Sequence, residues 1–164
     1  MNETLKVTTP SDREIVITRV FDAPRSLIFD CMSKAELVRR WLLGPPGWTM
    51  PVCEIDLKVG GRYRYVWRGP DGSEMGMGGV YREIVRPERI VQTELFDQDW
   101  TGGETLGTAL LNEAGGRTTL TITELYSSKE ARDAALRTGM TEGMSAGYDR
   151  LAELLASMLA EGHK

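Results

Sequence analysis

The stretch RYRYVWR, residues 62–68, is followed at once by GPDGS, residues 69–73. Aromatic side chains alternate with arginines in the first segment, which is the two-residue period of a strand with one buried face. The second segment carries the proline, aspartate and glycine that are typical of a tight turn. Together they predict a β-hairpin. Its expected inner face is Tyr63, Tyr65 and Trp67, and its expected outer face is Arg62, Arg64 and Arg68.

The flanking sequence extends this hairpin into a larger antiparallel sheet. Turn residues recur at 86–89 and at Gly115-Gly116, so the whole region 52–125 reads as consecutive hairpins. EIVITRVF, residues 14–21, predicts a further strand. Because no long helical segment interrupts residues 52–125, we expect a single meander rather than a parallel sheet.

Helical patterns lie on both sides of the predicted sheet. Pro24 suits the start of one short helix, and Ser33 with Glu36 has the spacing of a capping box for a second, KAELVRRW, residues 34–41. Ser127 and Glu130 predict another cap before KEARDAALR, after which Gly139 suggests a break. A long helix is then expected, with one apolar stripe: Met140, Met144, Tyr148, Leu151, Leu155 and Leu159.

This order of elements predicts an α+β helix-grip fold, a curved antiparallel sheet with two short helices and a long C-terminal helix. The long helix is the only element large enough to cover the apolar face of the sheet. We expect one domain over residues 13–161, preceded by a flexible segment over residues 1–12.

Composition narrows the function classes. The net charge is -4 and the isoelectric point is near 5.2, which argues against a nucleic-acid binder. With no signal peptide and no apolar run of membrane-spanning length, we expect a cytoplasmic protein without membrane insertion.

Cys31 and Cys53 are expected to be reduced and buried. The only histidine is His163, so we expect no metal site, no cofactor and no histidine-based catalytic triad.

Four segments resemble, in order and spacing, the heat-shock-protein-90 ATPase activator homologue family of the SRPBCC superfamily. They are FDAPRSLIFDCMSKAELVRRWLLGPPGW, DLKVGGRYRYVWRGPDG, GGVYREIVRPERIV and GMTEGMSAGYDRLAELLA. That superfamily also includes START lipid-transfer domains, polyketide cyclases and birch-pollen-type allergens. The resemblance implies a helix-grip fold with a cavity between sheet and helix. It leaves the activity open, since the same fold serves lipid binding, cyclisation, toxin sequestration and co-chaperone work.

The leading hypothesis is a small-molecule binding protein whose cavity takes a hydrophobic, aromatic or lipid-like ligand. Large aromatic side chains would supply apolar area and phenol groups would orient the ligand. In WLLGPPGW, residues 41–48, Trp41 is expected to anchor a helix and Trp48 to lie at the rim. The expected ligand-binding residues are Trp48, Tyr63, Tyr65, Trp67, Tyr81, Met140, Gly143, Met144 and Tyr148.

Two other functions stay open. A cyclase- or hydrolase-like enzyme would use a carboxylate and tyrosine hydroxyls, and it is favoured if Glu83, Glu94 or Glu124 points inward beside Tyr63 or Tyr81. No nucleophile lies beside a base in the sequence, so no catalytic residue is assigned. A co-chaperone would contact heat-shock protein 90 through the outer face of the sheet, and a homodimer is also possible.

Glycine recurs every fourth residue at Gly139, Gly143 and Gly147. A glycine inside a helix costs about 1 kcal/mol relative to alanine, so this spacing calls for a packing reason. We expect Gly143 to face the sheet or the cavity.

Overall fold

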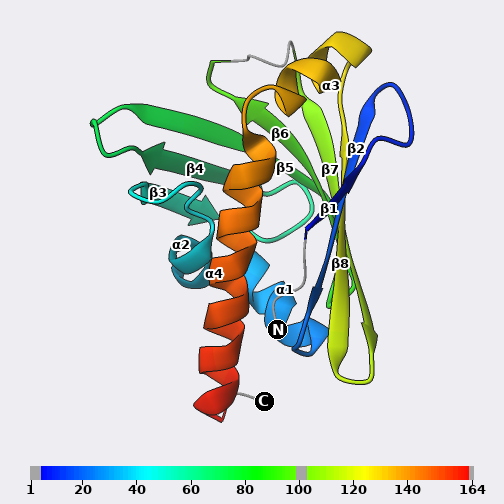
Figure 1. Cartoon of the computed structure of the whole chain (residues 1–164), viewed down its shortest axis with the longest axis vertical. Helices are drawn as coiled ribbons and strands as arrows, with labels where there is room; N and C mark the ends of the chain where they lie inside the picture. Colours follow the sequence, from blue (N-terminus) through cyan, green and yellow to red (C-terminus); the bar gives the residue numbers. More distant parts are fainter. Residues whose placement is uncertain (1–4, 99–102, 163–164) are drawn as a thin grey trace.

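Eight antiparallel strands form one curved, open sheet that wraps around a long C-terminal helix (Figure 1). This is a computed structural model, and it describes residues 5–98 and 103–162. The strands are β1 (Lys6–Thr8), β2 (Glu14–Phe21), β3 (Thr49–Ile55), β4 (Arg62–Arg68), β5 (Glu74–Val85), β6 (Arg89–Phe96), β7 (Thr105–Ala114) and β8 (Arg117–Leu125). Their order in the sheet is β1-β2-β8-β7-β6-β5-β4-β3, which confirms the predicted helix-grip fold.

The predicted faces of RYRYVWR are confirmed. Tyr63, Tyr65 and Trp67 are 3, 4 and 8% exposed, whereas the arginines of the same strand are exposed or half-buried. The ring centroids of Tyr63 and Tyr65 are 5.0 Å apart, and those of Tyr65 and Trp67 are 5.7 Å apart. The aromatic face of β4 is therefore part of a continuous core.

Two short helices and the long helix lie on the concave side of the sheet (Figure 1). They are α1 (Arg25–Ser33), α2 (Ala35–Trp41) and α4 (Met140–Ala160), with α3 (Lys129–Leu136) between β8 and α4. Tyr148, Leu151 and Leu155 of α4 are buried as predicted. Leu159 is 38% exposed and does not belong to the buried face, where Leu154 and Met158 lie instead.

Two predicted helix caps are wrong. Ser33 is the last residue of α1, and its hydroxyl donates a hydrogen bond of 2.7 Å to the carbonyl oxygen of Phe29. Helix α2 therefore begins after Lys34 without a side-chain cap. At α3 the capping residue is Ser128 rather than Ser127, and its hydroxyl accepts the backbone N–H of Ala131 at 3.0 Å. Gly139 does separate α3 from α4, in the left-handed conformation with φ of 77°.

The predicted flexible segment contains a strand. Residues Lys6–Thr8 form β1, which pairs with β2 along Thr18, Ile17 and Val16. The prediction failed here because three residues are too few to show a strand period. Residues 1–4, residues 100–102 of the polar stretch after β6, and His163 lie outside the described residues.

The sheet is open, with β1 and β3 at its two edges. In β3 the register shifts between Thr49 and Val52, and Pro51 lies at this irregularity with its side chain exposed.

Among the described residues, no helix combines the length and hydropathy that crossing a membrane requires. Both cysteines are free and buried, as predicted, and the Cys31 sulfur lies 3.7 Å from that of Met158.

The glycines of α4 allow a close approach to α2 rather than to the sheet. A Cβ atom on Gly147 would lie 3.4 Å from the carbonyl oxygen of Trp41. On Gly143 it would lie 3.8 Å from Cδ of Pro45, in the loop that follows α2. The prediction that Gly143 faces the sheet or the cavity is therefore wrong, because this side of α4 is turned toward α2 and its loop.

Candidate functional site

Two carboxyl groups meet on the concave face of the sheet. Glu94 lies on β6 and Glu124 on β8, with β7 between them, and Gly107 of β7 pairs with Glu124 in the register. A Cβ atom on Gly107 would lie 2.5 Å from Oε2 of Glu94 and 2.9 Å from Oε1 of Glu124. The missing side chain at Gly107 is thus what lets the two carboxyl groups approach each other. We call Glu94 and Glu124 the carboxyl pair.

The carboxyl pair shares a hydrogen bond, which requires a proton. Burial, repulsion from Glu94 and this hydrogen bond together raise the pKa of Glu124 well above its ordinary value. Burial also raises the pKa of Glu94, and its hydrogen bond with Glu124 opposes that rise. Glu124 is 7% exposed, and one proton is shared between the two carboxyl groups. In the described part of the chain, no lysine or arginine forms an ion pair with either group.

The charge of the carboxyl pair acts on three buried phenol groups. Burial raises the pKa of Tyr63, Tyr126 and Tyr148, and the negative charge of the pair raises each of them further. The Tyr63 hydroxyl donates a hydrogen bond of 2.6 Å to the carbonyl oxygen of Thr93. The Tyr126 hydroxyl lies 3.8 Å from the sulfur of Met140, at the start of α4. Tyr148 is 5% exposed, and its ring packs edge-on against Phe21 and stacks on Trp41, with centroids 5.9 and 5.6 Å apart.

Arg19 is the buried cation of the concave face. It follows Ile15 and Ile17 on the inner side of β2, is 2% exposed, and donates a hydrogen bond of 2.8 Å to Asp149 of α4. Its Nε atom is buried without a partner among the described residues. Its charge opposes the burial that raises the pKa of Tyr148. Tyr148 therefore lies within electrostatic reach of both Arg19 and the carboxyl pair.

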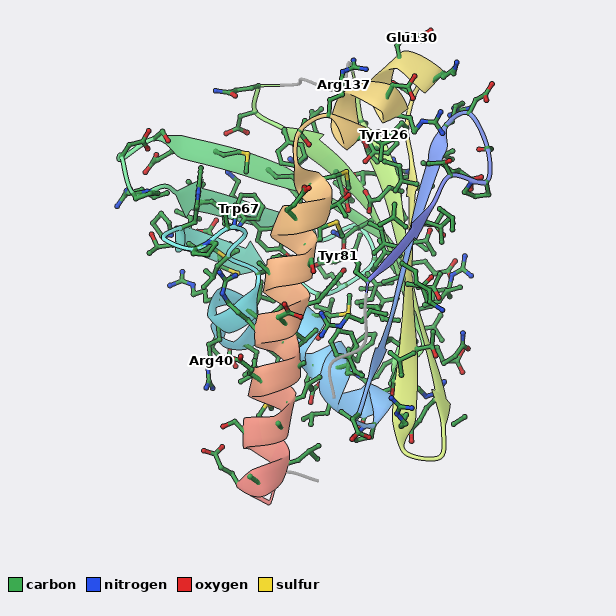
Figure 2. The ribbon with its side chains drawn as sticks, viewed as in Figure 1. Arg40, Trp67, Tyr81, Tyr126, Glu130 and Arg137 are labelled. Atoms are coloured by element: carbon green, nitrogen blue, oxygen red, sulfur yellow. The ribbon has the colours of Figure 1, made fainter. Side chains whose placement is uncertain are left out.

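The structure brings some of the predicted site residues together and separates others. Figure 2 shows Tyr81 and Tyr126 projecting toward the space beside α4, whereas Arg40 points away from it. Tyr63, Tyr65 and Tyr81 form one ring cluster, with the centroids of Tyr63 and Tyr81 5.4 Å apart. Trp67 extends this cluster, with its ring centroid 5.7 Å from that of Tyr65. Met140 contacts Tyr126, whereas Tyr148 packs on Phe21 and Trp41.

The remaining predicted residues lie elsewhere or at the margin. Trp48 is half-buried and packs beside the turn between β4 and β5, where a Cβ atom on Gly69 would lie 3.1 Å from its ring. Gly143 faces Pro45, in the loop after α2. Met144 is half-buried and packs against the core.

Glu94 and Glu124 were predicted only as separate candidates, and Arg19 was not among the predicted residues. The period of EIVITRVF does place Arg19 on the same face as Ile15 and Phe21, so alternation was the available signal. The meeting of Glu94 with Glu124 depends on the strand between them, which no local pattern reveals.

Two hollows, of about 280 and 700 Å³, open on the outer face of β4, β5 and β6. They lie on either side of the ion pair between Arg64 and Asp97, which crosses Gly76. Neither lies between the sheet and α4, so the predicted ligand cavity there stays a prediction.

Within the described residues, no group of three or more His, Cys, Asp or Glu side chains could hold a metal ion.

Comparison with known proteins places the chain in a family. The family model described as "Activator of Hsp90 ATPase homolog 1-like protein" matches residues 22–156. No curated protein matches the chain significantly.

Solved structures show the same fold. The crystal structure of a protein from Rhodobacter sphaeroides is 32% identical with a TM-score of 0.88, covering 93% of this chain and 98% of that one. A protein from Mycobacterium smegmatis is 25% identical with a TM-score of 0.82, covering 93% and 96%. An HSP90 activator from Plasmodium falciparum is 22% identical with a TM-score of 0.63, covering 88% and 96%, which shows a shared fold alone. With most of its length matched by the family model, the chain belongs to the Activator of Hsp90 ATPase homolog 1-like family.

Proposed function

We propose that the protein binds a small, mainly apolar molecule between the sheet and the first turns of α4, where the carboxyl pair supplies polar recognition. The observation that carries this proposal is the meeting of the buried Glu124 with the partly buried Glu94 over Gly107, with no ion-paired cation among the described residues. Taking two carboxyl groups out of water is costly unless charges compensate them. Groups kept in such an environment are concentrated at functional sites.

The packing of α4 supports this location. Leu151, Leu154 and Leu155 in its second half are at most 6% exposed, so that half is sealed against the core. In its first turns Met140 and Met144 are only partly buried, and Met140 contacts the hydroxyl of Tyr126. Methionine side chains adapt easily to a new neighbour, so the first turns are where a ligand can enter.

Binding of a neutral fluorescent dye, N-phenylnaphthylamine, tests this proposal. The protein is unfolded, freed of bound molecules and refolded before the titration. We expect Met144→Trp, which adds bulk at the entrance, to weaken binding at least about tenfold. Leu159→Trp is the matched control, because Leu159 is exposed at the far end of α4. Equal binding by both variants, or no binding by the refolded wild type, would refute the proposal.

An acid–base enzyme is a second candidate, and the carboxyl pair favours it. Glu94 and Glu124 both lie on the inner face, with their charge acting on Tyr63, as that hypothesis requires. A carboxyl pair sharing one proton can hold an acid and a base side by side. The measurement is exchange of carbon-bound protons of a bound ligand with heavy water. Exchange that is lost in Glu94→Gln while binding persists would support catalysis.

Heat-shock protein 90 is a further candidate partner, on the strength of the family description alone. The assay is stimulation of the ATPase activity of purified heat-shock protein 90 by this chain. Homodimerisation is tested separately by light scattering.

A further inference from the structure

We infer that Arg19 binds a carboxylate group of the ligand, through the edge of its guanidinium group that Nε and Nη2 form. This inference rests on the proposed binding function and names the chemistry of one end of the ligand. The observation that carries it is a side chain only 2% exposed, whose Nε is buried without a hydrogen-bond partner among the described residues. A buried donor without a partner is costly, so this donor calls for an acceptor that the described chain does not supply.

Arg19 uses only one of its side-chain nitrogen atoms. Nη1 donates to Oδ1 of Asp149 at 2.8 Å, and this is the one side-chain hydrogen bond of Arg19 in the part of the chain that the structure describes. Nε and Nη2 lie on one edge of the planar guanidinium group, where two parallel N–H bonds match the two oxygen atoms of a carboxylate. The unused edge of Arg19 therefore has the geometry of a carboxylate receptor.

Two other arginines have more partners than Arg19. Arg132 is 9% exposed, and it donates hydrogen bonds of 2.8 Å from both Nε and Nη1. Arg64 is exposed, yet both its Nη1 and its Nη2 donate to Asp97. Arg19 is the most deeply buried of the three, so an unpaired donor is most costly there. Its single hydrogen bond is thus a deficit that a ligand acid would correct.

The surroundings of Arg19 favour a contact with an acid. Its guanidinium carbon lies 5.3 Å from the ring centroid of Phe21, and Leu120, opposite Arg19 on β8, is fully buried. Opposite charges attract more strongly in such apolar surroundings than in water. The Asp149 side chain is 52% exposed, so water screens this counter-charge, and the side chain can turn outward when a ligand acid arrives.

The carboxyl pair does not reach this position. Glu124 lies opposite Ile15, whereas Arg19 lies opposite Leu120, and four residues along β2 separate the two levels. This separation corresponds to about 13 Å. The unused edge of Arg19 is therefore left for an acid that arrives with the ligand, while the apolar body of the ligand extends toward the first turns of α4.

The test compares two probes of the same shape, naphthylacetate and naphthylethanol, whose binding to the refolded protein is measured by calorimetry at neutral pH. We expect the acid to bind at least about tenfold more tightly than the alcohol. Arg19→Met removes the charge and the donors, so the acid should fall to the level of the alcohol. Arg19→Lys keeps the charge without the paired edge, so only part of the preference should remain.

Arg64→Met is the matched control, because it makes the same change at an exposed arginine on the outer face, and the preference for the acid should persist. Asp149→Asn separates recognition from packing. It keeps an oxygen acceptor for Nη1 and removes the competing charge, so it should tighten binding of the acid and leave the alcohol unchanged. A purely structural role of the ion pair would instead weaken both probes.

Equal affinity of acid and alcohol in the wild type would overturn the inference, and so would a preference that survives Arg19→Met or is lost in Arg64→Met. Circular dichroism checks the folding of each variant. The wild-type and Asp149→Asn comparisons decide the question even if Arg19→Met fails to fold. Binding of N-phenylnaphthylamine reports on the proposed function independently, so the inference can fail while that function stands.

Discussion

The indole nitrogen of Trp67 on β4 donates a hydrogen bond of 2.8 Å to the carbonyl oxygen of Leu42, just beyond α2. The indole nitrogen of Trp41 donates another, of 2.9 Å, to the carbonyl oxygen of Cys31 in α1. Together with Trp48 beside the turn at Gly69, these contacts fasten the Gly-Pro-Pro-Gly loop to the sheet and to the short helices. Trp41, Trp48 and Trp67 together therefore hold α2 and the loop after it against the sheet.

Trp67→Ala should lower the free energy of unfolding by about 3–5 kcal/mol, because it removes a large buried ring and leaves a cavity. Trp67→Phe keeps most of the apolar area and loses the donor to Leu42, so it should cost about 1–3 kcal/mol. Denaturation in urea measures both values. A loss below about 1 kcal/mol for the alanine variant would contradict the packing described for Trp67.

Asp149→Ala should destabilise the protein by about 1–3 kcal/mol, because it leaves the 2% exposed guanidinium of Arg19 without its partner, while the Asp149 side chain itself is 52% exposed. Asp97→Ala is the control, since it breaks an ion pair with Arg64 in which both side chains are at least 40% exposed. Such surface pairs contribute about 0–1 kcal/mol. Urea denaturation compares the two variants, and equal losses would argue against the buried role of Arg19.

The free energy of unfolding should depend on pH through the carboxyl pair. Burial raises the pKa of Glu94 and Glu124 above 4.5, so the folded chain holds more protons than the unfolded chain above that pH. Their contribution to stability is therefore full below pH 4.5 and is lost as the pH rises through the raised pKa. Glu124→Gln, which mimics the protonated acid, should reduce this loss.

The measurement is the urea concentration at the midpoint of unfolding, determined at several pH values between about 5 and 8 for the wild type and for Glu124→Gln. Glu83→Gln serves as the control, because Glu83 forms its ion pair with Arg89 away from the carboxyl pair. If Glu124→Gln keeps the full pH dependence of the wild type, the carboxyl pair does not cause it.

Gly143→Ala should raise the free energy of unfolding by up to about 1 kcal/mol, since alanine is the better helix former and its Cβ atom would only touch Pro45. Gly147→Leu should lower it by about 1–3 kcal/mol, because the side chain would push α4 away from the backbone of Trp41. Thermal melts compare the two. Destabilisation by Gly143→Ala would mean that this face of α4 is more tightly packed than described.

The parts of the fold that follow from short-range patterns were predictable. The strand Glu14–Phe21 and the inner face of β4 were found because alternation repeats every two residues within one element. The break at Gly139 was found for a similar local reason. The cap at Ser127 was misplaced because Ser128 offers the same signal one residue later. The cap at Ser33 was wrong because its hydroxyl donates to Phe29 within α1.

The candidate site was less predictable, because strand pairing assembles it. Glu94 and Glu124 meet only because β7 places Gly107 between them, and this depends on the register of three strands. The direction of Gly143 was wrong because glycine spacing shows that a helix is approached closely but does not show by what. Large aromatic residues were correctly placed inside, yet their position relative to Glu94 could not be read from the chain.

The two sheet edges have a consequence for how copies of this chain behave at high concentration. An unpaired edge strand is a template on which another chain can add, and long flat edges lead to aggregation. Here β1 has only three residues, and β3 carries Pro51, which has no N–H to offer, at a shift in register. Both edges are thus poor templates, and the open sheet is protected from growing into fibrils without having to close into a barrel.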